Sequence, residues 1–81
     1  MKRLLHIDLA VRDILRQAAP GLRIAIANTL LDLIEEPEPL GAVPYGGIPN
    51  AFEIRTDTFR MVYTCGPDHV SIWVLEINTQ R

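Results

Sequence analysis

The sequence has few of the residues that stabilise small proteins through covalent or metal bonds. Cys65 is its single cysteine, which excludes an internal disulfide framework. His6 and His69 are its two histidines, and one cysteine with two separated histidines predicts no metal site. We therefore expect neither a metal nor another cofactor.

Long apolar runs are also absent. No stretch approaches the roughly 18 apolar residues that a membrane span needs. The first five residues look like the start of a signal peptide, but His6 and Asp8 interrupt the apolar stretch too early. We expect a cytoplasmic protein without membrane contact.

An excess of positive charge is missing as well, since the formal net charge is −2. The charges are unevenly spread: residues 1–24 carry +3, residues 25–53 carry −5, and residues 54–81 are balanced. Proteins that bind nucleic acid through charge alone are usually clearly basic. Any contact with nucleic acid must therefore be local or be delivered by a larger partner.

The residues that are present suit one globular domain, residues 1–81, because 48% are hydrophobic and 22% are charged. Residues 3–7 suit a short strand. Apolar residues at helical spacing follow Asp8, whose carboxylate we expect to cap the first helical turn. A Pro-Gly pair breaks this helix, and a second, largely apolar helix is predicted over residues 21–36. The tight turn between them predicts a helical hairpin.

The second half of the chain predicts a loop followed by three strands. Residues 37–51 are rich in proline and glycine, which favours a loop. Apolar and polar residues then alternate over 52–56, 59–65 and 70–77. Connections of two and four residues between these segments predict an antiparallel meander.

Counting from these loop lengths predicts which residues lie opposite each other. Ile54 then faces Met61, Tyr63 faces Ile72, and Met61 also faces Val74. One face of the meander is apolar throughout. Covering it with the two helices gives a two-layer α+β fold: an N-terminal strand and a helical hairpin packed on an antiparallel meander.

The same counting places Arg55 directly opposite Arg60 on the other face. Two neighbouring guanidinium groups suit a phosphate or a partner's carboxylate. The alternative is that both long side chains splay into water. Like charges in this position destabilise a sheet slightly.

Apolar residues accompany the two arginines. Val62 is expected to face Trp73, with Leu75 and Ile77 extending the strip. An exposed strip of this kind is typical of a partner-binding surface. The alternative is that the chain's own loop, residues 37–51, covers it.

Three further residues have candidate roles. Tyr45, in the predicted loop, is the aromatic residue best placed to stack on an RNA base. Tyr63 falls on the apolar face, where we expect packing alone. Cys65 falls on the same face as a small buried hydrophobe.

In this order of elements the sequence resembles the RelE/ParE superfamily of bacterial type II toxins. Residues 52–63, FEIRTDTFRMVY, match an aromatic residue, a strand with a basic–Ile–basic pattern, a short turn and a second strand that begins with an aromatic and an arginine. The Pro/Gly pattern of residues 37–49 also fits, and the resemblance covers essentially the whole chain.

The resemblance implies a cognate antitoxin that binds and neutralises this chain, in an assembly of the two or a homo-oligomer. RelE-like members cut mRNA on the ribosome without a metal, through attack of a 2′-hydroxyl on the neighbouring phosphate. Arg60 would then stabilise the phosphate, and Arg55 would take the second basic place of the preceding strand.

The sequence also departs from the family pattern. Glu53 stands where RelE-like nucleases place a first base, and Gln80 stands where an arginine is expected. Arg81 follows one residue late and is a candidate RNA contact. Two alternatives stay open: a ParE-like inhibitor of DNA gyrase without catalysis, and a weakly active homologue that binds an antitoxin.

Overall fold

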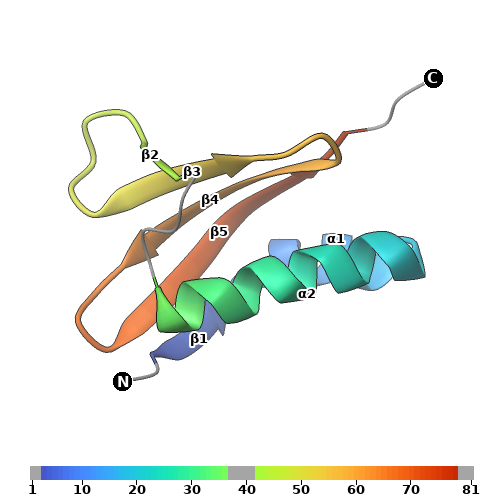
Figure 1. Ribbon diagram of the computed structural model, residues 1–81, viewed down its shortest axis with the longest axis horizontal. Coiled ribbons are helices and arrows are strands. Elements are labelled where there is room, and N and C mark those ends of the chain that lie inside the picture. Colours follow the sequence, from blue (N-terminus) through green and yellow to red (C-terminus); the bar gives the residue numbers. More distant parts are fainter. Residues whose placement is uncertain (1–2, 37–41, 79–81) are drawn as a thin grey trace.

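The computed structural model describes residues 3–36 and 42–78, which form five strands and two helices. Figure 1 shows the strands as one sheet with both helices on one side of it. In chain order the elements are β1 (Leu4–Ile7), α1 (Leu9–Gln17), α2 (Pro20–Glu35), β2 (Val43–Pro44), β3 (Ala51–Arg55), β4 (Phe59–Cys65) and β5 (His69–Ile77). The predicted two-layer α+β architecture is confirmed.

The sheet is mixed, with the strand order β1-β5-β4-β3-β2. β1 runs parallel to β5, whereas β2, β3, β4 and β5 pair antiparallel with their neighbours. The expectation that residues 37–51 contain only loop is wrong, because β2 lies in this segment. Pro44 is tolerated there because β2 is an edge strand, where a missing N–H costs no ladder hydrogen bond.

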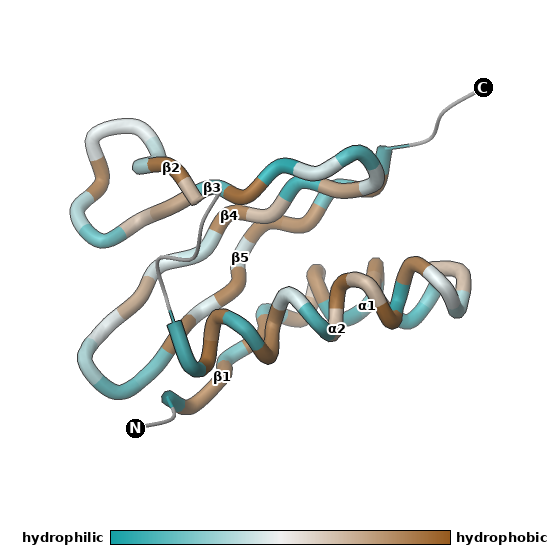
Figure 2. Tube along the Cα trace, in the orientation of Figure 1, coloured by the Kyte–Doolittle hydropathy of each residue, from teal (hydrophilic) through white to brown (hydrophobic). Residues whose placement is uncertain are grey.

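The core lies between the sheet and the helices. α2 buries Ile26, Leu30 and Leu33, and further hydrophobic segments along it, coloured brown in Figure 2, stay outside the core. Met61 and Tyr63 of β4 are fully buried, so the packing role predicted for Tyr63 is confirmed. The buried cluster comprises Val11, Ile26, Leu30, Leu33, Ile54, Phe59, Met61, Tyr63, Val70, Ile72 and Leu75.

The helix boundaries follow their sequence signals closely. Pro20 occupies the first turn of α2, where its missing N–H would have no partner in any case. Asp8 occupies the N-cap position of α1, but its side chain makes no capping hydrogen bond. The predicted cap is therefore wrong, and the Asp8 carboxylate is left for other contacts. Neither helix of the described chain has the length and apolarity that a bilayer crossing requires.

A β-bulge separates the observed register from the predicted one. Tyr63 faces Ile72 as predicted, but the next pair is Val62 with Val74, so Trp73 is the extra residue of β5. The predicted pairs of Val62 with Trp73 and of Met61 with Val74 are therefore wrong. Sequence alternation cannot show a single inserted residue, because it assumes a constant period of two.

The bulge also reverses the expected position of Leu75. Leu75 faces Met61 and is 3% exposed, so it belongs to the core and not to an exposed strip. Ile77 faces Phe59 and packs against the same core.

Candidate anion site on the outer face of the sheet

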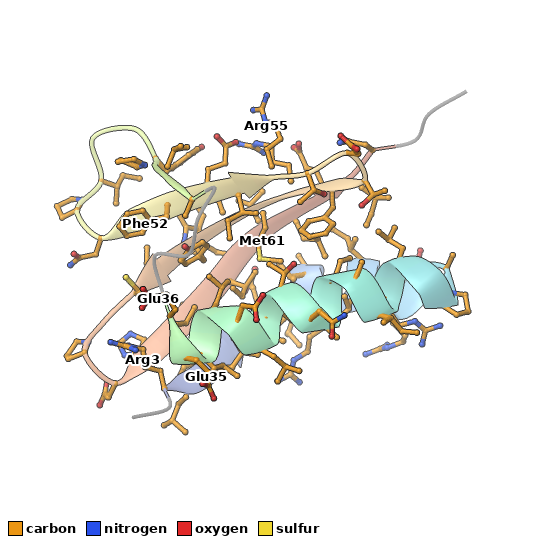
Figure 3. All side chains as sticks on the ribbon, viewed as in Figure 1. Arg3, Glu35, Glu36, Phe52, Arg55 and Met61 are labelled. Atoms are coloured by element: carbon orange, nitrogen blue, oxygen red, sulfur yellow. The ribbon has the colours of Figure 1, made fainter. Side chains whose placement is uncertain are left out.

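We call the side of the sheet that faces away from the helices the outer face. Arg55 lies opposite Arg60 there, as predicted. Figure 3 shows Arg55 pointing away from the helices, whereas Met61 points into the space between the sheet and α2. The counting from loop length was therefore correct for the hairpin of β3 and β4.

The turn between β3 and β4 is held by side-chain hydrogen bonds. The Thr56 hydroxyl accepts from the backbone N–H of Thr58 at 3.2 Å and of Phe59 at 3.1 Å. The side-chain amide of Asn78 donates to the Thr56 carbonyl at 3.3 Å and thereby ties the end of β5 to this turn. These contacts fix the register that brings the two arginines together.

Glu53 lies between the two arginines. Its Oε2 accepts a hydrogen bond from Arg60 Nε and another from Arg55 Nη2, the latter at 3.2 Å. The Glu53 and Arg60 side chains are 17% and 20% exposed, whereas Arg55 is 69% exposed. Two guanidinium groups therefore converge on one carboxylate oxygen, an arrangement that can hold an anionic oxygen.

Glu76 is a further partner of Arg60, and the sequence analysis missed it. Arg60 Nη1 lies 3.1 Å from Glu76 Oε1. The bulge causes this contact, since it moves Glu76 to the position opposite Arg60. Without the bulge, Leu75 would stand there.

The ion pairs shift the titration of both groups. The hydrogen bond from Arg60 lowers the pKa of Glu53, desolvation opposes this effect, and the hydrogen bond from Arg55 adds to it. The hydrogen bond to Glu53 raises the pKa of Arg60. Both groups are therefore charged at neutral pH.

Two aromatic rings extend the site along the outer face. Tyr45 and Trp73 meet edge to face, with ring centroids 5.8 Å apart. The Arg60 guanidinium carbon lies 6.0 Å from the centroid of the Tyr45 ring, at the outer limit of a cation–π contact. The candidate RNA contact Tyr45 therefore lies beside the candidate phosphate contact Arg60.

The connection between β2 and β3 holds Tyr45 in place. The Tyr45 N–H donates to the Ala51 carbonyl at 2.9 Å. Gly46 at φ 56° and Asn50 at φ 62° take the left-handed conformation in this connection. Glycine and asparagine are the residues that adopt it at least cost.

The predicted apolar strip is only partly present. Val62 is fully buried and lies outside the main core cluster, so the expectation that it is exposed is wrong. The expectation that Leu75 is exposed is also wrong, because the bulge turns it into the core. Trp73 remains 36% exposed. Tyr45 packs against Trp73, so the alternative that residues 37–51 cover the strip is correct in part.

The arginines border an open hollow. Arg55, Arg60, Glu76 and Asn78 line about 620 Å³ of space. Some N–H donors of both arginines are already bound to Glu53, and Arg60 also pairs with Glu76. An incoming anion must therefore compete with two carboxylates.

Two further predicted residues remain to be placed. Arg81 lies outside the described residues. Cys65 is half-buried and packs against the core cluster. Among residues 3–36 and 42–78, no three His, Cys, Asp or Glu side chains lie close enough together to hold a metal ion.

The structure joins the two histidines, which the sequence analysis treated separately. The His6 and His69 rings meet edge to face at 5.7 Å, because β1 lies beside β5. Asp68 Oδ1 lies 3.0 Å from His69 Nδ1, and this hydrogen bond lowers the pKa of Asp68. A pairing between strands so far apart in sequence could not be counted from loop lengths.

Comparison with known proteins gives structural relatives only. No family model and no curated protein matches the sequence. The toxin–antitoxin complex RelBE2 of Mycobacterium tuberculosis contains a similar chain at 20% identity and a TM-score of 0.79, covering 96% of this chain and 100% of that one. The isolated RelE toxin of E. coli matches at 17% identity and a TM-score of 0.81, covering 98% and 87%.

A third similar structure is the intact E. coli RelBE toxin–antitoxin complex, at 20% identity and a TM-score of 0.77, covering 98% of this chain and 99% of that one. The fold implied by the sequence resemblance is thus confirmed over nearly the full length. The chain has the fold of the RelE toxins.

Proposed function

We propose that the chain is the toxin of a type II toxin–antitoxin pair and cleaves mRNA on the ribosome without a metal. One observation carries the proposal: two guanidinium groups, of Arg55 and Arg60, converge on a single anionic oxygen on the outer face. Groups placed in this way suit a phosphate that gains negative charge during reaction.

The chemistry requires little of the protein beyond positioning and charge. The 2′-oxygen of one nucleotide loses its proton and bonds to the adjacent phosphorus. The bond from phosphorus to the 5′-oxygen then breaks, and that oxygen takes up a proton. The products are a 2′,3′-cyclic phosphate and a 5′-hydroxyl. Arg60 stabilises the extra charge on the phosphate, Arg55 assists it, and Tyr45 offers a ring for a neighbouring base.

An antitoxin partner is part of the proposal. Two of the similar solved structures are complexes of a toxin with its antitoxin. In this chain Trp73 is the exposed aromatic residue of the outer face, and we retain it as a contact for the antitoxin. Val62 and Leu75 are both buried and therefore offer no surface for this contact.

A second candidate function has its own support. Glu53 and Glu76 already neutralise Arg60, an arrangement that a nuclease does not need. A ParE-like inhibitor of DNA gyrase, or a weakly active homologue that binds an antitoxin, would keep the fold without a free cationic site. Cleavage and gyrase inhibition must therefore be measured together.

The test is Arg60→Ala, with Arg16→Ala as the matched control. Arg16 is an exposed arginine of α1 whose only ion pair among the described residues is with Asp13, at 3.6 Å. Cells expressing each variant are scored for growth arrest, and their mRNA is mapped by primer extension. A gyrase supercoiling assay runs in parallel on purified protein.

We expect wild-type and Arg16→Ala chains to arrest growth and to produce discrete mRNA cuts. Arg60→Ala should lose both effects while keeping its circular dichroism spectrum, with cleavage reduced at least about a hundredfold, as for the loss of one oxyanion donor. Full toxicity of folded Arg60→Ala, or growth arrest with blocked supercoiling and intact mRNA, would reject the nuclease.

A further inference from the structure

A second hollow lies at the β1 edge of the sheet, where β1, the start of α1 and β5 meet. It encloses about 320 Å³, and its polar lining comes from His6, Asp8, Arg12 and Ser71. Trp73 also lines the hollow. No residue lines both this hollow and the one at the arginine pair. The proposed chemistry at Arg60 therefore leaves this second hollow without a function.

The Trp73 ring is oriented by its contact with Tyr45. Its edge-to-face contact with Tyr45, at an interplanar angle of 80°, restricts the indole orientation. Trp73 as a residue nevertheless remains 36% exposed. Aromatic side chains in this state are the usual platforms for single-stranded nucleic acid bases, because every base has a π-face. The volume of the hollow is at the lower end of small-ligand sites.

The polar lining of the hollow includes the carboxylate of Asp8. Asp8 makes no capping bond to α1, and within residues 3–36 and 42–78 its carboxylate has no ion pair. A carboxylate offers two adjacent acceptors, which match the N1–H and N2–H₂ donors of guanine. Adenine and uracil present a donor next to acceptors at the same edge, so they fit a carboxylate less well.

The surroundings of Asp8 suit the rest of a nucleotide. Arg12, one turn along α1 from Asp8, also lines the hollow. The His6 and Ser71 side chains lie side by side on the paired strands β1 and β5. Arginine suits a phosphate, and a hydroxyl suits a ribose oxygen.

We propose that this hollow binds one guanine base of single-stranded RNA, stacked on Trp73 and hydrogen-bonded to Asp8. Arg12 contacts the adjoining phosphate. The contact series Trp73–Tyr45–Arg60 connects this base subsite to the site of cleavage. The inference rests on the proposed nuclease function and adds to it the base that the chain selects.

Trp73 is the only tryptophan, so its fluorescence reports directly on the hollow. The wild-type protein is titrated with GMP, AMP, CMP and UMP, with excitation where nucleotides do not absorb. N-acetyltryptophanamide corrects for collisional quenching. Asp8→Asn is the test variant. Asp13→Asn is the matched control, because Asp13 lies on the same helix, carries the same charge and does not line the hollow.

We expect GMP to quench Trp73 saturably and to bind roughly tenfold more tightly than the other nucleotides, as one bidentate contact provides. Asp8→Asn should remove this preference, and Asp13→Asn should keep it. Absence of saturable quenching, equal affinity for all four nucleotides, or an unchanged preference in Asp8→Asn would overturn the inference. Growth arrest in cells reports separately on the proposed function, so the two can fail independently.

Discussion

At the scale of single residues, Glu53 controls how freely Arg55 and Arg60 can bind another anion. Its carboxylate occupies the hydrogen-bonding groups of Arg55 and Arg60 that face a common point on the outer face. The sequence showed only that Glu53 stands where RelE-like nucleases place a basic residue. The structure adds that it also competes with a phosphate for the same donors.

Replacing Glu53 should therefore strengthen anion binding. Glu53→Gln keeps the shape of the side chain but removes its charge, so both guanidinium groups become freer to bind a phosphate. We expect roughly tenfold tighter binding of a short single-stranded RNA, measured by fluorescence anisotropy at fixed salt. Asp57→Asn removes the same charge from the adjacent exposed turn. An equal gain in Asp57→Asn would show an effect of net charge alone.

Glu53 should also make stability depend on pH. Its pKa is lower in the folded chain than the ordinary value of 4.5. The unfolded chain thus binds more protons near that pH, and the free energy of unfolding rises with pH. The stabilisation is complete above the unfolded pKa and is lost as the pH falls through the folded pKa.

We expect urea unfolding between about pH 5 and pH 3 to show a steeper loss of stability in the wild-type chain than in Glu53→Gln. Asp13→Asn, which alters an exposed carboxylate on α1, controls for a general effect of acid. The same slope in wild-type and Glu53→Gln chains would contradict an ion pair maintained in solution.

At the scale of elements, the bulge in β5 controls which side chains reach the outer face. It turns Leu75 into the core and Glu76 towards Arg60. Leu75→Ala should therefore cost about 3 kcal/mol of the free energy of unfolding, as for other buried leucines. Urea denaturation measures this cost.

Leu31→Ala is the matched control for this prediction. Leu31 is 60% exposed on α2, so we expect a change within about 0.5 kcal/mol. A loss in Leu75→Ala as small as in Leu31→Ala would place Leu75 on the surface and would restore the unbulged register.

The bulge also marks the point at which strand pairing can no longer be predicted from the sequence. Turn length and alternation were enough to place Arg55 opposite Arg60 and Tyr63 opposite Ile72, because both are local counts. From Val62 towards Phe59 the predicted pairing of β4 with β5 is wrong, because no residue type marks Trp73 as an inserted residue. Glu76 was therefore missed as a partner of Arg60.

Long-range pairing was the second limit. The parallel contact of β1 with β5 joins residues more than 60 positions apart, as in the pair of Leu4 with His69. No turn connects these strands directly, so neither the His6–His69 contact nor the hollow at Asp8 could be derived from spacing. β2 was missed because two residues are too few to show alternation.

At the scale of the whole molecule, the fold presents two different surfaces. The outer face carries the ion pairs of Arg55 and Arg60, the hollow that these arginines border and the Tyr45–Trp73 pair. The helical side exposes scattered apolar residues, among them Ile24 and Leu31 of α2. An antitoxin that prevents RNA from reaching Arg60 by direct coverage must occupy the outer face.

Trp73→Ala should therefore weaken antitoxin binding at least about tenfold, since exposed tryptophans commonly dominate interface energies. Leu31→Ser serves as the control on the helical side and should leave affinity unchanged. Isothermal titration of each variant with the proposed cognate antitoxin measures both effects. Weakening by Leu31→Ser with full affinity in Trp73→Ala would place the antitoxin on the helices. Neutralisation would then have to act at a distance, through a change in the sheet, because the outer face would remain open to RNA.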